Sequence, residues 1–173
     1  MFHLDTQKTN HADVIEILLD GAFGPNRHAR QSYVYRDGID DITALRFVAL
    51  EDDHLIGTIR FWPVAIGKAL TPAILLGPLG VMKGRQGEGI GAALIDHGLT
   101  QARSHGHRIC ALVGPLDYYG RFGFAPAESR GILMPGEQPH RLLLRELEND
   151  ALEGVSGDLF RAETGSGYSA ASA

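Results

Sequence analysis

Three glycines within five residues give the stretch RQGEGIGAAL, residues 85–94, its chemical character. The residues that follow favour a helix, and the N-terminus of a helix presents backbone N–H groups without intrahelical partners. Together with the helix dipole, these groups attract anions, and glycines let a phosphate approach the backbone without meeting a Cβ atom. Arg85 and Lys83 add positive charge just before the loop. The stretch therefore predicts a site for a pyrophosphate group between a strand and a helix.

Two common phosphate motifs fit this loop less well. A Walker-type loop needs a Lys-Ser or Lys-Thr pair after its last glycine, and none follows here. Gly87, Gly89 and Ala92 do satisfy the G-x-G-x-x-A dinucleotide fingerprint. That fingerprint also needs an acidic residue at the end of the next strand, and the segment RICALVG, residues 108–114, contains none. A site for NAD(P) or FAD therefore stays as the less favoured alternative.

Two motifs together resemble a known family. Gln86-x-x-Gly89-x-Gly91 resembles the Q/R-x-x-G-x-G/A signature of the GNAT N-acetyltransferase superfamily. The segment YGRFGF, residues 119–124, resembles that family's Y-x-x-x-G-F motif, and the longer string GPLDYYGRFGFAPA resembles its YhbS-like branch. One predicted helix and one predicted strand separate the two motifs, which is similar to the family's arrangement. The resemblance is strongest over residues 76–127.

The resemblance implies an α+β fold with a mixed central sheet flanked by helices. A V-shaped splay would separate the strands at residues 72–82 and 108–113, and acetyl-CoA would bind there as the co-substrate. Its pyrophosphate would lie on the N–H groups of the loop, and its pantetheine arm would pair with the strand end. The Gly77-Pro78 interruption would be a bulge that directs a backbone N–H at the thioester oxygen. The expected acetyl-CoA-binding residues are Leu79, Gly80, Val81, Arg85, Gln86, Gly87, Glu88, Gly89, Ile90, Gly91 and Ala92.

The resemblance further implies that an amine of a small molecule or protein attacks the thioester directly. Tyr119 matches the position of the family's general acid, which would protonate the departing thiolate. No base can be assigned, because the strand PAILLGPLGVM has no carboxylate or histidine, and Asp117 is interpreted as an N-cap. The missing carboxylate keeps a second hypothesis open, in which the same fold binds CoA without catalysis.

Several elements must position these motifs. Apolar spacing predicts a helix that follows an Asn10 N-cap and buries Val14, Ile17 and Leu18. Further helices are expected at residues 27–35, 89–104 and 118–122. Strands are expected at residues 2–4, 43–50, 54–64, 72–82, 108–113 and 140–147, the second and third forming a hairpin around Asp52-Asp53. The resemblance places Asp20, Asp37, Asp40 and Asp41 on the acceptor side, with a solvated acidic surface as the alternative. Trp62 and Pro63 are candidates for the same side, with a plain core role as the alternative.

Composition sets broad limits on the class of protein. With 173 residues, 44% hydrophobic and 21% charged, the chain predicts one globular domain at residues 1–163 and a loose tail at 164–173. A net charge of −5 and the lack of any long apolar run argue against nucleic-acid and membrane partners. The single cysteine, Cys110, fits core packing and a reduced, cytoplasmic location. His105 and His107 lack a third ligand, so no metal is expected, and exposed strand edges are compatible with a homodimer.

Overall fold

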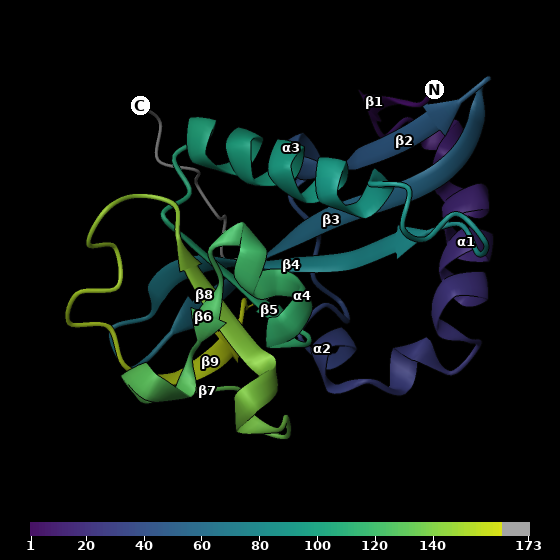
Figure 1. The fold of residues 1–173 in the computed structure, drawn as a ribbon. Coiled ribbons are helices and arrows are strands. Elements are labelled where there is room, and N and C mark those ends of the chain that lie inside the picture. Colours follow the sequence, from purple (N-terminus) through teal and green to yellow (C-terminus); the bar gives the residue numbers. More distant parts are fainter. Residues whose placement is uncertain (164–173) are drawn as a thin grey trace.

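A mixed sheet forms the centre of the computed structural model, which describes residues 1–163 (Figure 1). Neighbouring strands are antiparallel, except that β4 pairs with β5 and β7 with β9 in parallel. Across the sheet the order is β1 (His3–Thr6), β2 (Phe47–Glu51), β3 (His54–Ile66), β4 (Thr71–Val81), β5 (Ile109–Val113), β8 (Leu142–Glu146) and β6 (Ala125–Pro126). Off this path, β9 (Gly157–Arg161) pairs with the end of β3 on the edge opposite β4, and also with β7 (Ile132–Leu133). The predicted α+β class is confirmed.

The helices lie mostly in the connections that the sequence predicts. They are α1 (Ala12–Phe23), α2 (Gln31–Val34), α3 (Ile90–Ser104) and α4 (Leu116–Tyr119). Short 3-10 turns occupy Thr9–His11, Arg27–Ala29, Thr43–Leu45, Gly120–Phe122, Glu128–Arg130 and Pro139–Arg141. No helix in residues 1–163 has the length and apolar character needed to cross a membrane. The tail predicted at residues 164–173 lies outside the described part of the chain.

Helix α3 packs closely on one face of the sheet, above β2, β3 and β4 (Figure 1). Two glycines permit this approach. A Cβ atom on Gly57 of β3 would lie 2.8 Å from a methyl carbon of Ile90, and one on Gly98 would lie 2.8 Å from the ring of Phe61. The helix that carries the glycine-rich loop is therefore fixed to the sheet by close backbone contact.

Helix α1 packs on the opposite face of β3 and β4. A Cβ atom on Gly80 would lie 2.6 Å from Leu19, so the contact with β4 again depends on a glycine. Gly80 pairs with Thr58, and Gly57 is the next residue along β3 from Thr58. Adjacent residues of a strand point to opposite faces, so Gly80, which meets α1, and Gly57, which meets α3, lie on different faces of the sheet. The sheet thus separates the helix that carries the glycine-rich loop from helix α1, and β4 contacts both of these helices.

The predicted buried stripe of the first helix is right for Leu18 and wrong for Val14 and Ile17. Ile15, Leu18 and Leu19 are buried, whereas Val14 and Ile17 are 46% and 72% exposed. Apolar residues lie on more than one side of this helix, so its sequence is compatible with two stripes, and contact with β4 selects one. The predicted N-cap was also wrong, because Asn10 belongs to the 3-10 turn at Thr9–His11 and α1 begins after His11.

Two glycine-to-alanine substitutions in helices should change stability in opposite directions. In α3, Gly98→Ala should cost about 1–3 kcal/mol, because the new methyl group would meet the Phe61 ring in a filled core. In α1, Gly21→Ala should stabilise the protein by about 0.5–1 kcal/mol, because no atom lies within 4 Å of the new Cβ and alanine favours the helix. Chemical denaturation of both variants measures the difference. Equal effects would mean that α3 does not depend on this close contact.

Candidate active site

The central parallel strands separate after a short pairing. β4 and β5 pair only as Ile74 with Cys110 and Leu75 with Ala111. β4 then continues to Val81 with β3 as its strand partner on the other edge. A cavity of about 80 Å³ opens where they part, between Leu76–Leu79 of β4 and Leu112–Val113 of β5. The predicted V-shaped splay is present, and the free edge of β4 can pair with an extended ligand.

A bulge in β4 lies at the mouth of this splay. Ile59 of β3 faces Leu79, whereas Phe61 faces Leu76, so Gly77 and Pro78 together oppose one residue. Two residues opposite one define a β-bulge, which redirects the strand and its backbone groups. Gly77 has a φ of 130°, and its carbonyl oxygen accepts a hydrogen bond of 2.7 Å from the Trp62 indole N–H. The bulge that Gly77-Pro78 predicts is therefore present and fixed by a side chain of β3.

The glycine-rich loop presents a continuous row of unused backbone donors. Gly87 and Gly89 have φ values of 86° and 82°, which favour glycine, and Gly89 is the N-cap of α3. The first N–H of the helix that donates a hydrogen bond is that of Ala93, which donates to the carbonyl oxygen of Gly89 at 2.9 Å. Within the described residues, the backbone N–H groups of residues 86–92 have no hydrogen-bond acceptor. No atom lies within 4 Å of a Cβ built on Gly87 or Gly89, so the side-chain positions of these two glycines are open.

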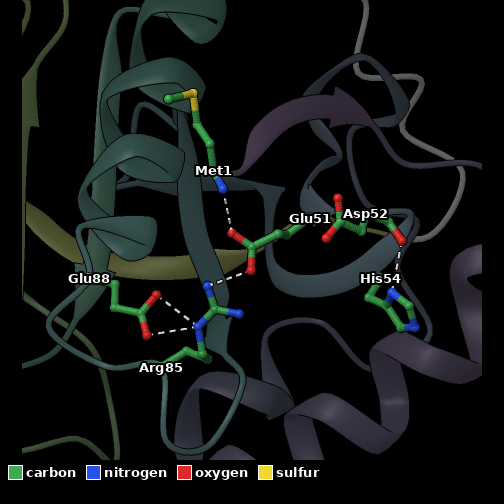
Figure 2. A network of polar contacts seen from close by, with 6 residues as sticks. All are labelled: Met1, Glu51, Asp52, His54, Arg85 and Glu88. Carbon is green, nitrogen blue, oxygen red and sulfur yellow. Dashed lines mark hydrogen bonds and ion pairs between the residues drawn. The ribbon is translucent and has the colours of Figure 1, made fainter.

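Arg85, expected to supply positive charge to this loop, is held by two carboxylates (Figure 2). Its Nε lies 2.7 Å from both carboxylate oxygens of Glu88, and its Nη2 lies 2.9 Å from Glu51. The Met1 ammonium group binds the other oxygen of Glu51 at 2.9 Å. Glu88 and then Glu51 raise the pKa of Arg85. Positive charge is present at the loop, but Glu88, itself in the loop, competes for it.

Tyr119 lines the cavity between the separated strands. Helix α4 follows β5 through Gly114, and a Cβ atom on Gly114 would lie 2.5 Å from the Tyr119 ring, so this glycine makes room for the ring. No hydrogen-bond partner of the Tyr119 hydroxyl lies within residues 1–163. Burial, with a smaller contribution from Tyr118, raises the pKa of Tyr119 to about 12. The phenol is therefore protonated at neutral pH and keeps a proton that it can donate.

The neighbouring Tyr118 serves a different part of the site. Its hydroxyl would lie 3.0 Å from a Cβ built on Gly91, and its ring meets Tyr119 edge to face with centroids 4.8 Å apart. Tyr118 thus reaches the start of α3, while Tyr119 faces the cavity between the strands. The predicted N-cap role of Asp117 was wrong, because Pro115 is the N-cap of α4 and Asp117 lies in the first turn without a capping bond.

A second cavity, of about 460 Å³, lies on the α1–α2 side of the bulge. It shares Tyr33, Arg36 and Pro78 with the smaller cavity, so the two meet at the bulge. Trp62 and Asp37, two of the residues predicted to lie on the acceptor side, both line it. By contrast, Asp20 and Asp41 form ion pairs with Arg27 and Arg46. Cys110 is fully buried and burial raises the pKa of its thiol, in keeping with a packing role.

Comparison with known proteins assigns the family. The model of the acetyltransferase (GNAT) family matches residues 11–124. The chain belongs to the GNAT acetyltransferase family. The N-acetyltransferase YhbS of Escherichia coli is 28% identical over 146 residues, which cover 83% of this chain and 86% of YhbS. The resemblance of the two sequence motifs to this family and to its YhbS-like branch is thus confirmed.

Solved GNAT structures confirm the fold. YhbS of Escherichia coli, in complex with CoA, superposes with a TM-score of 0.81 at 26% identity and covers 94% of this chain and 90% of its own. A GNAT family acetyltransferase of Brucella melitensis, in complex with acetyl-CoA, gives a TM-score of 0.70 at 31% identity, with 94% and 96% coverage. The GNAT fold therefore spans nearly all of the described chain, including the N-terminal region that carries no sequence motif.

Arg36 is the principal residue of this region that the sequence does not single out. It lines both cavities and touches the bulge, yet it lies just after α2 in a segment with several other charged residues. Its place directly after Tyr33 and Tyr35, in YVYRD at residues 33–37, is the only local signal. Nothing in that string indicates that it packs against Gly77, 41 positions along the chain.

Proposed function

We propose that this protein transfers the acetyl group of acetyl-CoA to a primary amine by direct attack. The observation that carries the proposal is the row of free N–H groups at residues 86–92, placed beside the splayed edge of β4. The family, and the CoA and acetyl-CoA complexes of YhbS and the Brucella melitensis protein, support it. The acceptor would enter by the larger cavity and the thioester by the smaller one, and they would meet at the bulge.

The described residues fit each part of acetyl-CoA. The donors of residues 86–92 suit a pyrophosphate, since they lie at the N-terminus of a long helix, and no atom lies within 4 Å of a Cβ built on Gly87 or Gly89. The free edge of β4 suits the amide-containing pantetheine arm, which would pair with Leu79 and Val81 as an added strand does. Leu76 and Leu112 line the narrow cavity between the strands, where an acetyl group would contact apolar side chains.

The chain's own groups would act on the transfer in three ways. A backbone N–H at the bulge would stabilise the oxyanion; because Pro78 has no N–H, the donor must be Gly77 or Leu79. Tyr119 would donate a proton, or a hydrogen bond, to the sulfur as the carbon–sulfur bond breaks. The amine nitrogen would form the new bond to the acetyl carbon and release its proton to solvent. The products are an N-acetylated amine and CoA.

Calorimetric titration with acetyl-CoA, with NAD(P) titrated in parallel, tests the binding step. Micromolar binding of acetyl-CoA alone is expected. Binding of NAD(P) alone would contradict the proposal and favour the dinucleotide alternative. Release of free CoA thiol in the presence of a panel of primary amines then tests catalysis, and binding without any release would favour a CoA-binding module.

Glu88 provides a test of how the loop holds its charge. Glu88→Gln should strengthen acetyl-CoA binding about threefold at low salt, because Arg85 is freed from a carboxylate 2.7 Å away and can face the phosphates. The gain should shrink as salt is added, since the groups are exposed. Calorimetry at two salt concentrations measures it. The control is Glu148→Gln, which breaks another exposed pair, with Arg108 at 2.7 Å, away from the loop. Weaker binding in Glu88→Gln would mean that Glu88 orders the loop.

A further inference from the structure

Two almost fully buried arginines, Arg27 and Arg36, line the larger cavity, and they differ in whether carboxylates surround them. Arg27 is 2% exposed and is bound by Asp20 at 2.8 Å, by Glu16, and by the Tyr33 hydroxyl at 2.9 Å. Arg36 is 8% exposed, and within residues 1–163 no carboxylate lies at ion-pair distance from it. Its Nε is buried without a hydrogen-bond partner. The positive charge of Arg27 is thus balanced by carboxylates within the protein, while that of Arg36 is not.

The remaining neighbours of Arg36 do not supply the missing negative charge. Its guanidinium lies 4.7 Å from the centre of the Tyr33 ring, a contact with the face of an aromatic group. Burial, and next to it the nearby Arg27 charge, lower the pKa of Arg36 to about 10, opposed by Tyr33. Asp37 lines the same cavity but forms no ion pair with Arg36. A buried guanidinium without a carboxylate is costly in the free protein, and an anionic ligand would remove that cost.

The position of Arg36 places such an anion next to the reacting centre. A Cβ atom on Gly77 would lie 2.6 Å from the Arg36 Nη2, so the guanidinium touches the bulge. It also lines both cavities, together with Tyr33 and Pro78. A group bound to Arg36 and an amine poised at the bulge would therefore be close together within one acceptor molecule. The cavity of about 460 Å³ has the size of a small-molecule site.

We propose that the acceptor is an amino acid, whose carboxylate binds Arg36 while its amine faces the bulge. The planar guanidinium matches a carboxylate with two parallel hydrogen bonds, and burial strengthens that pairing. The inference rests on the proposed acetyl transfer and narrows its acceptor. A lysine side chain or the N-terminus of a protein has no carboxylate so close to its amine, and would leave Arg36 uncompensated.

The test compares the N-acetyl product of each amino acid with the matching N-acetyl amide, which keeps the acetylated nitrogen and side chain but has no carboxylate. N-acetylated products of the coded amino acids, and the matching N-acetyl amides, are titrated into the protein saturated with CoA. At least one acid should bind about tenfold or more tightly than its amide. In Arg36→Gln that ratio should fall to about one, whereas Arg36→Lys should keep part of it because the charge remains. Arg130→Gln, which removes an exposed arginine away from both cavities, should leave the ratio unchanged.

The outcomes separate this inference from the proposed function. If no acid binds better than its amide, or if Arg36→Gln keeps the preference, the role of Arg36 is overturned. Acetylation of simple amines at rates equal to those of amino acids would overturn the amino-acid acceptor while leaving acetyl transfer intact. Failure to bind acetyl-CoA would instead count against the proposed function. A cooperative thermal transition of Arg36→Gln shows that the variant is folded, and the acid-to-amide ratio of the unmodified protein tests the inference without any variant.

Discussion

Gly89→Val should lower the affinity for acetyl-CoA about a hundredfold or more. Gly89 has a φ of 82°, which a β-branched residue rarely adopts, and it caps the helix whose first N–H groups are free. Its side-chain position faces open space, so the added methyl groups would occupy the volume in front of the donors and keep a phosphate away. A hundredfold change corresponds to about 2.7 kcal/mol, within the range for losing several charge-assisted hydrogen bonds. Isothermal titration calorimetry measures it directly.

Gly106→Val is the matched control for this change. Gly106 follows the other end of α3, has a φ of 84°, and also has no atom within 4 Å of an added Cβ. Backbone strain and loss of stability should therefore be similar in the two variants, while the affinity for acetyl-CoA should fall only in Gly89→Val. Equal affinities in the two variants would show that the loop is not the pyrophosphate site.

Local signals in the sequence were sufficient to predict the local structure of those parts of the candidate site that lie close together along the chain. The loop of residues 85–94 carries its glycines, its charge and its helix start within ten positions, and the structure has each in the predicted place. The bulge at Gly77-Pro78 is equally local, because glycine and proline interrupt any strand ladder. The loop, the helix start and the bulge depend on the backbone conformations that glycine and proline allow, and these are set by residues adjacent in the sequence.

Contacts between distant segments were not predictable in the same way. The first helix has apolar residues on two sides, and only the position of β4 decides that Ile15 and Leu19 are buried. The strands β7 and β9 were missed, since β7 has two residues and β9, GDLFR, has one buried side chain. Arg36 was missed for the same reason, because its significance comes from packing against Gly77 and from the absence of a carboxylate around it.

If Arg36 serves to bind the acceptor, its buried charge should not stabilise the folded protein. Arg36→Met should leave the melting temperature unchanged or higher, because it removes a buried charge that no carboxylate compensates. Replacing an arginine that has a structural role should instead lower the melting temperature. Arg27→Met is the variant for comparison, because it would leave Asp20 and Glu16 without their partner. Thermal denaturation of the two variants without ligand decides between the roles, and a large loss of stability in Arg36→Met would indicate a structural one.

Tyr119→Phe should lower kcat about a hundredfold or more and leave the affinity for acetyl-CoA nearly unchanged. The substitution removes only the hydroxyl, while the ring keeps its place against Gly114, and loss of a general acid costs about 10²- to 10⁴-fold. Tyr118→Phe is the control, because its hydroxyl lies near Gly91 and not in the cavity between β4 and β5; its kcat should change little. Steady-state kinetics with a saturating acceptor, combined with calorimetry, separate turnover from binding. Equal kcat values for Tyr119→Phe and the unmodified protein would make Tyr119 a packing residue.

The pH dependence of turnover gives a second measure of the same role. Because burial raises the pKa of Tyr119 to about 12, the phenol keeps its proton as pH rises, and its donor function is lost only near that value. An exposed phenol would lose its proton near pH 10, so a tyrosine in solvent would make turnover fall about two pH units earlier. We therefore expect no alkaline decrease assignable to Tyr119 below about pH 11. A fall centred near pH 10 that disappears in Tyr119→Phe would show that the hydroxyl is solvated, and that the splay of β4 and β5 is open to water during turnover.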